Sequence, residues 1–304
     1  MLQHLLMIAP LLIMVVIGFI AQRLYQLQSR TLAALAIYIL SPAVVFLGIT
    51  GENIPLNILY LPPAVLIMGI VICLFSYFCA GFIWHDARQQ MVGFASGTAN
   101  SSYFGIPVCG AILGPEGVPV AVMFALGQTL FEATLGYYLA ARGQGSVKQS
   151  LIKLVKLPVL YALLIALVLR VQEWAMPVVA LETLVLLESA FTPIGMMLIG
   201  VGLAESKLRG RPDVRFMGAV LFAKFFLWML VTIAVIWLDT HYLHWFNPLI
   251  HKVMLLQAVA PVAVSTVAYS AQFKLFPEKM AMTVVLSLFV AVMMLWVVIT
   301  YFAI

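Results

Sequence analysis

MVGFASGTANSSYFGIPVCGAILG, residues 91–114, is long and apolar enough to cross a membrane, yet its middle is unlike a helix. Five glycines lie in it, and Asn100, Ser101, Ser102, Tyr103 and Pro107 gather near its centre. A proline frees a backbone carbonyl, and inside hydrocarbon such groups need other partners, so breaks persist where they line a cavity. We therefore predict a discontinuous helix at a substrate site. A close-packed helix interface rich in glycine and serine is the alternative.

A second stretch has the same character. HKVMLLQAVAPVAVSTVAYSAQ, residues 251–272, places Gln257, Pro261, Ser265 and Thr266 in the middle of an apolar segment. Two broken helices in corresponding halves of a chain indicate a binding site near the bilayer midplane. The amino ends of the half-helices would present free N–H groups and partial positive charge, which suits a carboxylate.

The composition is that of an integral membrane protein. Hydrophobic residues make up 64% of the 304 residues and charged residues only 9%, with a mean hydropathy of +1.12. Spans of about 20 apolar residues cross the hydrocarbon layer as helices. We predict an all-α protein with ten spans, at residues 4–22, 31–49, 59–81, 91–113, 119–140, 157–172, 178–202, 216–238, 249–270 and 280–304. The first span is expected to be retained as a helix and not cleaved as a signal peptide.

The cationic residues predict the orientation, because short cytoplasmic loops are rich in Lys and Arg. We number the loops between the predicted spans in chain order. The odd-numbered loops carry thirteen of the sixteen Lys and Arg residues: Arg23, Arg30, Arg88, Arg142, Lys148, Lys153, Lys156, Lys207, Arg209, Arg211, Arg215, Lys274 and Lys279. The even-numbered loops carry only Arg170 and Lys252. We expect a cell inner (plasma) membrane protein with both termini on the non-cytoplasmic side, and we attribute the basic excess to topology, not to nucleic acid.

An internal repeat is indicated by the prolines. ILSPAVVFLG (39–48) and FTPIGMMLIG (191–200) place Pro42 and Pro193 151 positions apart, and Pro107 and Pro261 are 154 apart. Five helices is an odd number, so a duplicated five-helix unit would insert the second time with inverted topology. We predict a first repeat at 1–140, a cytoplasmic linker at 141–156 and a second repeat at 157–304, although chance agreement of offsets is the alternative.

Ionisable groups within the spans are candidates for function, because burying a charge in the membrane is costly. Glu132 shares a helix face with Gln128, and Lys224 is expected at a similar depth. A Glu132–Lys224 pair would be either a structural ion pair or a proton-linked gate. Glu188, which precedes Pro193, could titrate or cap freed backbone groups. His, Cys and carboxylates do not cluster at ligand spacing, so we predict no metal, no disulfide and no cofactor.

Three motifs in order resemble the auxin efflux carrier family over nearly the whole chain. They are YILSPAVVF (38–46), NSSYFGIP (100–107) and QAVAPVAVSTVAYSAQFKLFPEKMAMT (257–283). The resemblance implies a fold like that of bile-acid symporters and Na⁺/H⁺ antiporters, with crossed broken helices 4 and 9. It implies a scaffold of helices 1, 2, 6 and 7 and a transport domain of helices 3–5 and 8–10 that moves like an elevator. It also makes a homodimer plausible. Plant members have a further proline where this chain has Thr266, which leaves the position of the ninth break open.

These features predict a secondary transporter of a small organic anion, a mono- or dicarboxylate, with H⁺ as a possible coupling ion. Candidate substrate-binding residues are Asn100, Ser101, Tyr103, Gly105, Pro107, Gln257, Pro261, Ser265 and Thr266. A membrane receptor or scaffold without transport remains an alternative. An intramembrane enzyme is disfavoured, because neither paired aspartates for a metal nor an HExxH motif occurs.

Overall fold

The computed structural model describes residues 2–50, 56–140, 158–174, 176–205 and 212–302, and all regular elements in these ranges are helical. The predicted linker, 141–156, lies outside the described residues. In the first half the elements are α1 (Leu2–Tyr25), α2 (Ser29–Leu35), η1 (Ala36–Leu40), α3 (Ser41–Thr50), η2 (Leu56–Tyr60), α4 (Leu61–Gly81), α5 (Ala87–Gly97), η3 (Ser101–Gly105), α6 (Ile106–Leu113), α7 (Gly117–Phe131), η4 (Glu132–Gly136) and α8 (Tyr137–Ala140).

The regular elements of the second half are also helical in its described ranges. Its elements are α10 (Pro158–Val171), α11 (Val178–Glu205), α12 (Val214–Phe222), η5 (Ala223–Leu227), α13 (Trp228–Leu238), η6 (Asp239–Leu243), α14 (Pro248–Ala258), α15 (Ser265–Gln272) and α16 (Pro277–Tyr301). The η elements are π-helical turns, apart from η2, which is a 3₁₀ helix.

Five helical stretches are long and apolar enough to cross a membrane by themselves. They are Asn57–Gly81, Gly117–Ala140, Val178–Glu205, Val214–Leu243 and Pro277–Tyr301. Of the other five expected spans, three correspond to shorter apolar helical stretches, Ala9–Tyr25, Thr31–Leu47 and Tyr161–Val171, and the fourth and ninth are interrupted. A multi-pass membrane protein is therefore confirmed, while the full count of ten spans stays a prediction.

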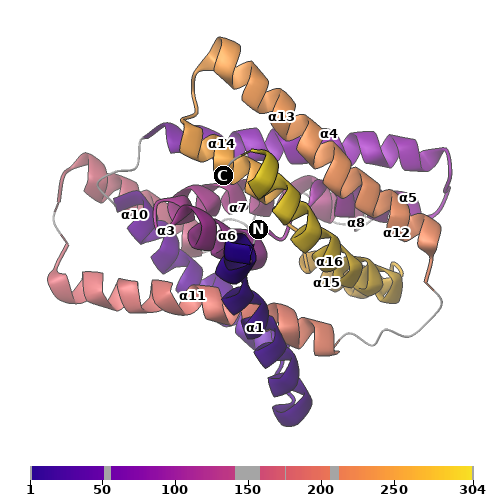
Figure 1. Ribbon diagram of the computed structural model, residues 1–304, viewed down its shortest axis with the longest axis horizontal. Helices are drawn as coiled ribbons and strands as arrows, with labels where there is room; N and C mark the ends of the chain where they lie inside the picture. Colours follow the sequence, from indigo (N-terminus) through magenta and orange to yellow (C-terminus); the bar gives the residue numbers. More distant parts are fainter. Residues whose placement is uncertain (1, 51–55, 141–157, 175, 206–211, 303–304) are drawn as a thin grey trace.

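Two groups of helices can be distinguished by their packing. Helix α1 packs along α11, and α3 packs against both α10 and α11. In the other group, α4 packs against α5 and α7, and α14 packs against α7 and α13. In Figure 1, α4 and α13 run along the upper side and α11 along the lower side, with the interrupted segments between them.

Glycines set the close crossing of α1 and α11. A Cβ on Gly18 would overlap the backbone of Met197, and one on Gly200 would overlap the backbone of Val15. Small residues let helices approach closely inside membranes, where packing replaces the hydrophobic effect as the source of association. These two glycines therefore allow the backbones of α1 and α11 to meet directly.

Contacts between loops sort them into two ends of the molecule. At one end Ser29 donates to Glu205, and Lys279 donates to Asp213 at 2.8 Å. At the other end the Asn57 side chain donates to the carbonyl of Trp245 at 2.6 Å. The first end joins odd-numbered loops and the second joins even-numbered loops, which is the grouping that the cationic residues predict.

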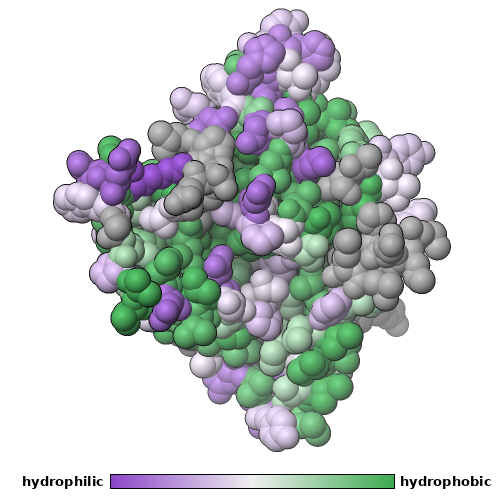
Figure 2. Space-filling model, turned by 60° about the vertical axis from the view of Figure 1, so that its left-hand side comes forward, coloured by the Kyte–Doolittle hydropathy of each residue, from purple (hydrophilic) through white to green (hydrophobic). Residues whose placement is uncertain are grey.

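The outer surface carries many large apolar side chains. Phe78 is 65% exposed, Leu186 73% and Phe289 65%. Figure 2 shows broad areas of hydrophobic residues on one face, with hydrophilic groups mostly toward the top and left-hand side of the view. A soluble monomer rarely exposes apolar patches of this extent, so a lipid environment accounts for them.

The paired prolines do not produce the same local structure. Pro193 lies inside the continuous helix α11, whereas Pro42 follows the π-helical turn η1. Pro107 is the second residue of α6, beyond the break in the fourth span and the turn η3, whereas Pro261 lies within the break of the ninth. The inverted repeat consequently remains a prediction based on the sequence.

Candidate functional site at the crossing of two broken helices

The fourth span breaks where its sequence is richest in small and polar residues. Helix α5 ends at Gly97, and helical structure resumes at Ser101. Asn100 closes the gap: its Oδ1 accepts a hydrogen bond from the Tyr103 N–H at 3.3 Å, and its carbonyl accepts from Gly105 at 3.0 Å. An asparagine side chain that accepts from a backbone N–H in this way is a favourable helix N-cap.

The ninth span breaks between Ala258 and Ser265. Residues 259–264 are outside regular helix, and α15 starts at Ser265. Thr266 Oγ1 donates to the carbonyl of Ala263 at 2.7 Å, which satisfies one group at the break. The break is therefore located around Pro261, and Thr266 already belongs to the first turn of the next helix.

The two breaks are in direct contact. The Asn100 N–H donates to the carbonyl of Pro261 at 2.8 Å. Neighbouring helices satisfy the adjoining groups, since Ala99 N donates to Gln128 Oε1 at 2.8 Å and Val262 N donates to Ser287 Oγ at 3.0 Å. Buried backbone groups need such partners away from water, so the crossing is held by hydrogen bonds made outside either helix.

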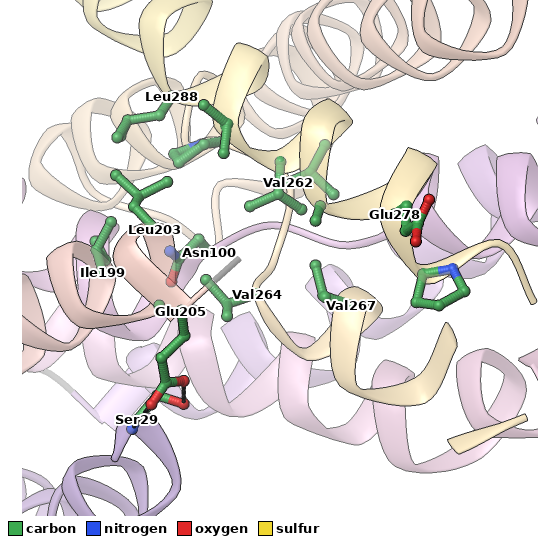
Figure 3. A pocket seen from close by; sticks show the side chains of 16 residues that line it. Ser29, Asn100, Ile199, Leu203, Glu205, Val262, Val264, Val267, Glu278 and Leu288 are labelled. Atoms are coloured by element: carbon green, nitrogen blue, oxygen red, sulfur yellow. Dashed lines mark hydrogen bonds between the residues drawn. The ribbon is translucent and has the colours of Figure 1, made fainter. Parts of the chain in front are cut away.

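A cavity of about 430 Å³ opens against this crossing. Asn100, Pro261, Val262 and Val264 contribute its inner wall, and Figure 3 shows the Asn100 side chain at the centre. Because the Asn100 Oδ1 faces the Tyr103 N–H, its Nδ2 is the end left to donate. The cavity therefore offers an uncharged amide donor beside a helix start.

The remaining walls are mostly apolar. They include Ile199 and Leu203 of α11 and Val284 and Leu288 of α16. Toward the end that holds the odd-numbered loops, the lining includes two acids, Glu205 and Glu278. Glu205 accepts from the N–H of Ser29 at 2.8 Å and from its hydroxyl, so this acid also caps the start of α2.

A family model described as "Membrane transport protein" matches residues 5–299. The chain belongs to this family. Its match also confirms the resemblance to the auxin efflux carriers.

Two relatives are themselves described only as uncharacterized transporters. One, from Methanocaldococcus jannaschii, is 26% identical over 211 residues, which is 65% of this chain and 68% of the relative. The other, from Methanothermobacter thermautotrophicus, is 26% identical over 216 residues, 66% of this chain and 68% of the relative. A transporter is thus supported, while neither description names a substrate.

In this membrane transport protein the structure places two of the nine predicted substrate-binding residues, Asn100 and Pro261, in the wall of the larger cavity. The other seven are not among its lining residues: Ser101, Tyr103, Gly105, Pro107, Gln257, Ser265 and Thr266. Gln257 is fully buried, its amide lies against Gly105, and neither of its polar atoms has a hydrogen-bond partner.

The predicted coupling residues are dispersed. Gln128 supports the fourth-span break, and Glu132 lies near Ser265 at the start of α15. Lys224 is directed at the carbonyl of Ala258 at 3.4 Å, and the ion pairs among the described residues do not include Glu132–Lys224. The structure thus places these two groups at opposite sides of the ninth break without joining them.

Glu188 lines a second cavity of about 300 Å³ between α11 and the α6–α7 region. Val44, Ile106, Gly110 and Val118 also line it. This smaller cavity and the larger one both lie against α11, and their linings share no residue. Glu188 is therefore separated from the amide of Asn100.

Sequence reasoning missed the contribution of α11 and α16 to the larger cavity. Leu203 and Glu205 belong to no motif, and Glu278 lies at the end of the third motif without having been singled out. Trp228 was also missed, although its spacing of four residues from Lys224 puts both on one helix face.

An ion-pair cluster at the odd-loop end joins three segments. Asp213 Oδ2 accepts from Lys279 Nζ at 2.8 Å and lies 3.4 Å from Arg88 Nη1. The hydrogen bond from Lys279 is the main cause that holds the pKa of Asp213 below its ordinary value, with further help from the Phe216 N–H and Arg88. Arg88 similarly lowers the pKa of Asp86.

Proposed function

We propose that this chain is a secondary transporter that carries a small organic anion by alternating access. The observation that carries the proposal is the amide donor of Asn100, set at the contact between two broken helices and facing a cavity of about 430 Å³. The first N–H groups of a helix have no intrahelical acceptor, so Ser101 and Ser102 add donors near the same point. A carboxylate would be bound there without a cationic side chain.

The walls favour one anionic group attached to an apolar body. Among the described lining residues there is no Lys, Arg or His, and the polar side chains are those of Ser29, Asn100, Glu205 and Glu278. A second carboxylate would face either aliphatic side chains or one of the two acids, and both environments disfavour an anion. We therefore narrow the substrate class from mono- or dicarboxylates to monocarboxylates with an apolar remainder.

Elevator movement is supported by the placement of the cavity between two packed groups of helices. Ile199 and Leu203 belong to α11 of the first group, whereas Asn100 and Pro261 belong to the broken helices that pack with the second. Movement of the second group against the first would carry the crossing toward the side of the smaller cavity. We propose that the first group acts as the scaffold and the second as the transport domain. We place the cytoplasm at the odd-loop end, with both termini on the opposite side.

The proposal includes proton coupling through Glu132 or Glu188, both of which lie outside the lining of the larger cavity. It is included because a buried carboxyl group beside a moving element can take up a proton in one state and release it in the other. Uptake with and without an imposed pH gradient tests it directly, and gradient-independent flux would remove it.

The substrate class is tested by uptake into proteoliposomes that contain the purified protein. We expect saturable uptake of labelled phenylacetate or hexanoate, with weak uptake of malonate. Glu278→Gln removes one acid from the cavity mouth and is expected to raise malonate uptake relative to phenylacetate. Glu116→Gln, a change of an exposed acid outside the cavity lining, is the matched control. Malonate uptake as fast as phenylacetate uptake by the unaltered protein would refute the assignment.

A further inference from the structure

The helical segment η5–α13 contacts the carboxyl ends of both broken helices. Trp228 Nε1 donates to the carbonyl of Ser96 at 2.8 Å, and Lys224 Nζ donates to the carbonyl of Ala258 at 3.4 Å. Ser96 is next to the last residue of α5, and Ala258 is the last residue of α14. One helix therefore supplies a donor to each of the two ends that meet at the crossing.

These donors match an electrostatic need of the broken helices. The last carbonyls of a helix lack intrahelical partners and carry a partial negative charge. Inside a membrane no water is available for them, so side-chain donors have to replace it. The Lys224 amine at the end of α14 and the Trp228 indole N–H at the end of α5 meet this need.

The two side chains also stabilise one another. Lys224 Nζ lies 4.6 Å from the centre of the Trp228 ring, which is within the range of a cation–π contact. Both side chains are fully buried. Neither residue lines the larger cavity, so any effect on a bound substrate passes through the backbone of the crossing.

We propose that Lys224 and Trp228 are positioning residues that clamp the carboxyl ends of α5 and α14 together. The clamp keeps the N–H of Asn100 on the carbonyl of Pro261, and so sets where the Asn100 amide points. Its effect on transport rests on the proposed function, but the clamp itself is a property of the fold and can be tested without a substrate.

The first test is hydrogen exchange of the purified protein in lipid nanodiscs, followed by mass spectrometry. Trp228→Phe keeps an aromatic ring, although a smaller one, and removes the indole N–H donor, while Lys224→Met removes the amine. Trp237→Phe is the matched control, because Trp237 is on the same helix and 54% exposed. We expect exchange in peptides over 97–101 and 258–263 to rise on the order of ten-fold in the first two variants, since each loses one buried hydrogen bond. The control is expected to exchange like the unaltered protein.

A general loss of stability has a different signature. It would raise exchange in α1 and α11 peptides as much as at the crossing, and that result would overturn the proposal. Unchanged exchange at the crossing in both variants would overturn it as well. Lys224→Gln, which keeps a donor without the charge, is expected to fall between the unaltered protein and Lys224→Met.

Transport kinetics provide a second measurement, which would not change if the role of the two residues were purely structural. For the carboxylate that the unaltered protein carries best, we expect Trp228→Phe to raise KM several-fold with a smaller change in maximal rate, because the binding geometry is loosened. An unchanged KM with only a lower rate would contradict positioning. If the unaltered protein carries none of the tested anions, the proposed function fails, while the exchange measurement still decides the clamp.

Discussion

Gly200→Ala tests the close crossing of α1 and α11 in the first group of helices. A methyl group at position 200 would overlap the Val15 carbonyl and lie 2.7 Å from the nitrogen of Phe19. These are backbone atoms, which cannot turn away as a side chain can. Relief therefore requires the two helices to separate.

The expected magnitude follows from two opposing effects. Overpacking a well-packed site typically costs about 1–3 kcal/mol, and a backbone clash belongs at the upper end. Replacing glycine by alanine inside a helix contributes about 1 kcal/mol in the opposite direction. Gly202→Ala gains the same helix propensity, and its added methyl group meets no atom within 4 Å. The difference between the two variants therefore isolates the steric cost, at about 1–3 kcal/mol.

The assay is reversible unfolding in mixed micelles, with the free energy of unfolding compared across the unaltered protein, Gly200→Ala and Gly202→Ala. We expect Gly200→Ala to be the least stable and Gly202→Ala to be at least as stable as the unaltered protein. Equal stabilities for the two variants would show that the helices do not meet as closely as described.

Two further outcomes are expected. Gly105→Ala should abolish most uptake, because its methyl group would overlap the fully buried side chain of Gln257. Gly218→Ala is the control, since its added methyl group meets no atom within 4 Å and should leave uptake unchanged. Full uptake by Gly105→Ala would contradict this prediction. Asp213→Asn should lower stability by less than about 1 kcal/mol at neutral pH, because Lys279 keeps the pKa of this carboxyl below its unfolded value. A carboxyl group whose pKa is lower in the folded than in the unfolded protein stabilises the fold at pH values above its unfolded pKa of about 3.9, and this stabilisation is lost as the pH falls through the folded pKa. The difference in free energy of unfolding between the unaltered protein and Asp213→Asn should therefore shrink below about pH 4. Unfolding measured from pH 7 to pH 3 checks this, and a pH-independent difference would refute it.

The sequence predicted the two breaks because their cause is local. Glycines, prolines and short polar side chains are poor helix formers, so several of them together in an apolar stretch favour a break. The contact between Asn100 and Pro261 could be anticipated only through the resemblance to a family, because the two residues lie far apart in the chain.

The identity of the cavity walls could not be predicted in the same way. Leu203 and Leu288 are ordinary apolar residues, and their role depends on which helix face turns toward the crossing. Likewise, Glu132 and Lys224 were natural partners by depth and charge, but the packing directs the ammonium group to a helix end instead. Pairing rules based on depth contain no information about rotation around a helix axis.

The central claim is that the Asn100 amide at the crossing holds the carboxylate of a transported anion. It is tested most directly by phenylacetate and hexanoate uptake into proteoliposomes that contain either the unaltered protein or Asn100→Ala, each first shown to be folded. The account predicts saturable uptake by the unaltered protein and loss of at least about ten-fold in uptake efficiency for Asn100→Ala, since a hydrogen bond to a charged group is removed. Full uptake by Asn100→Ala would contradict the account.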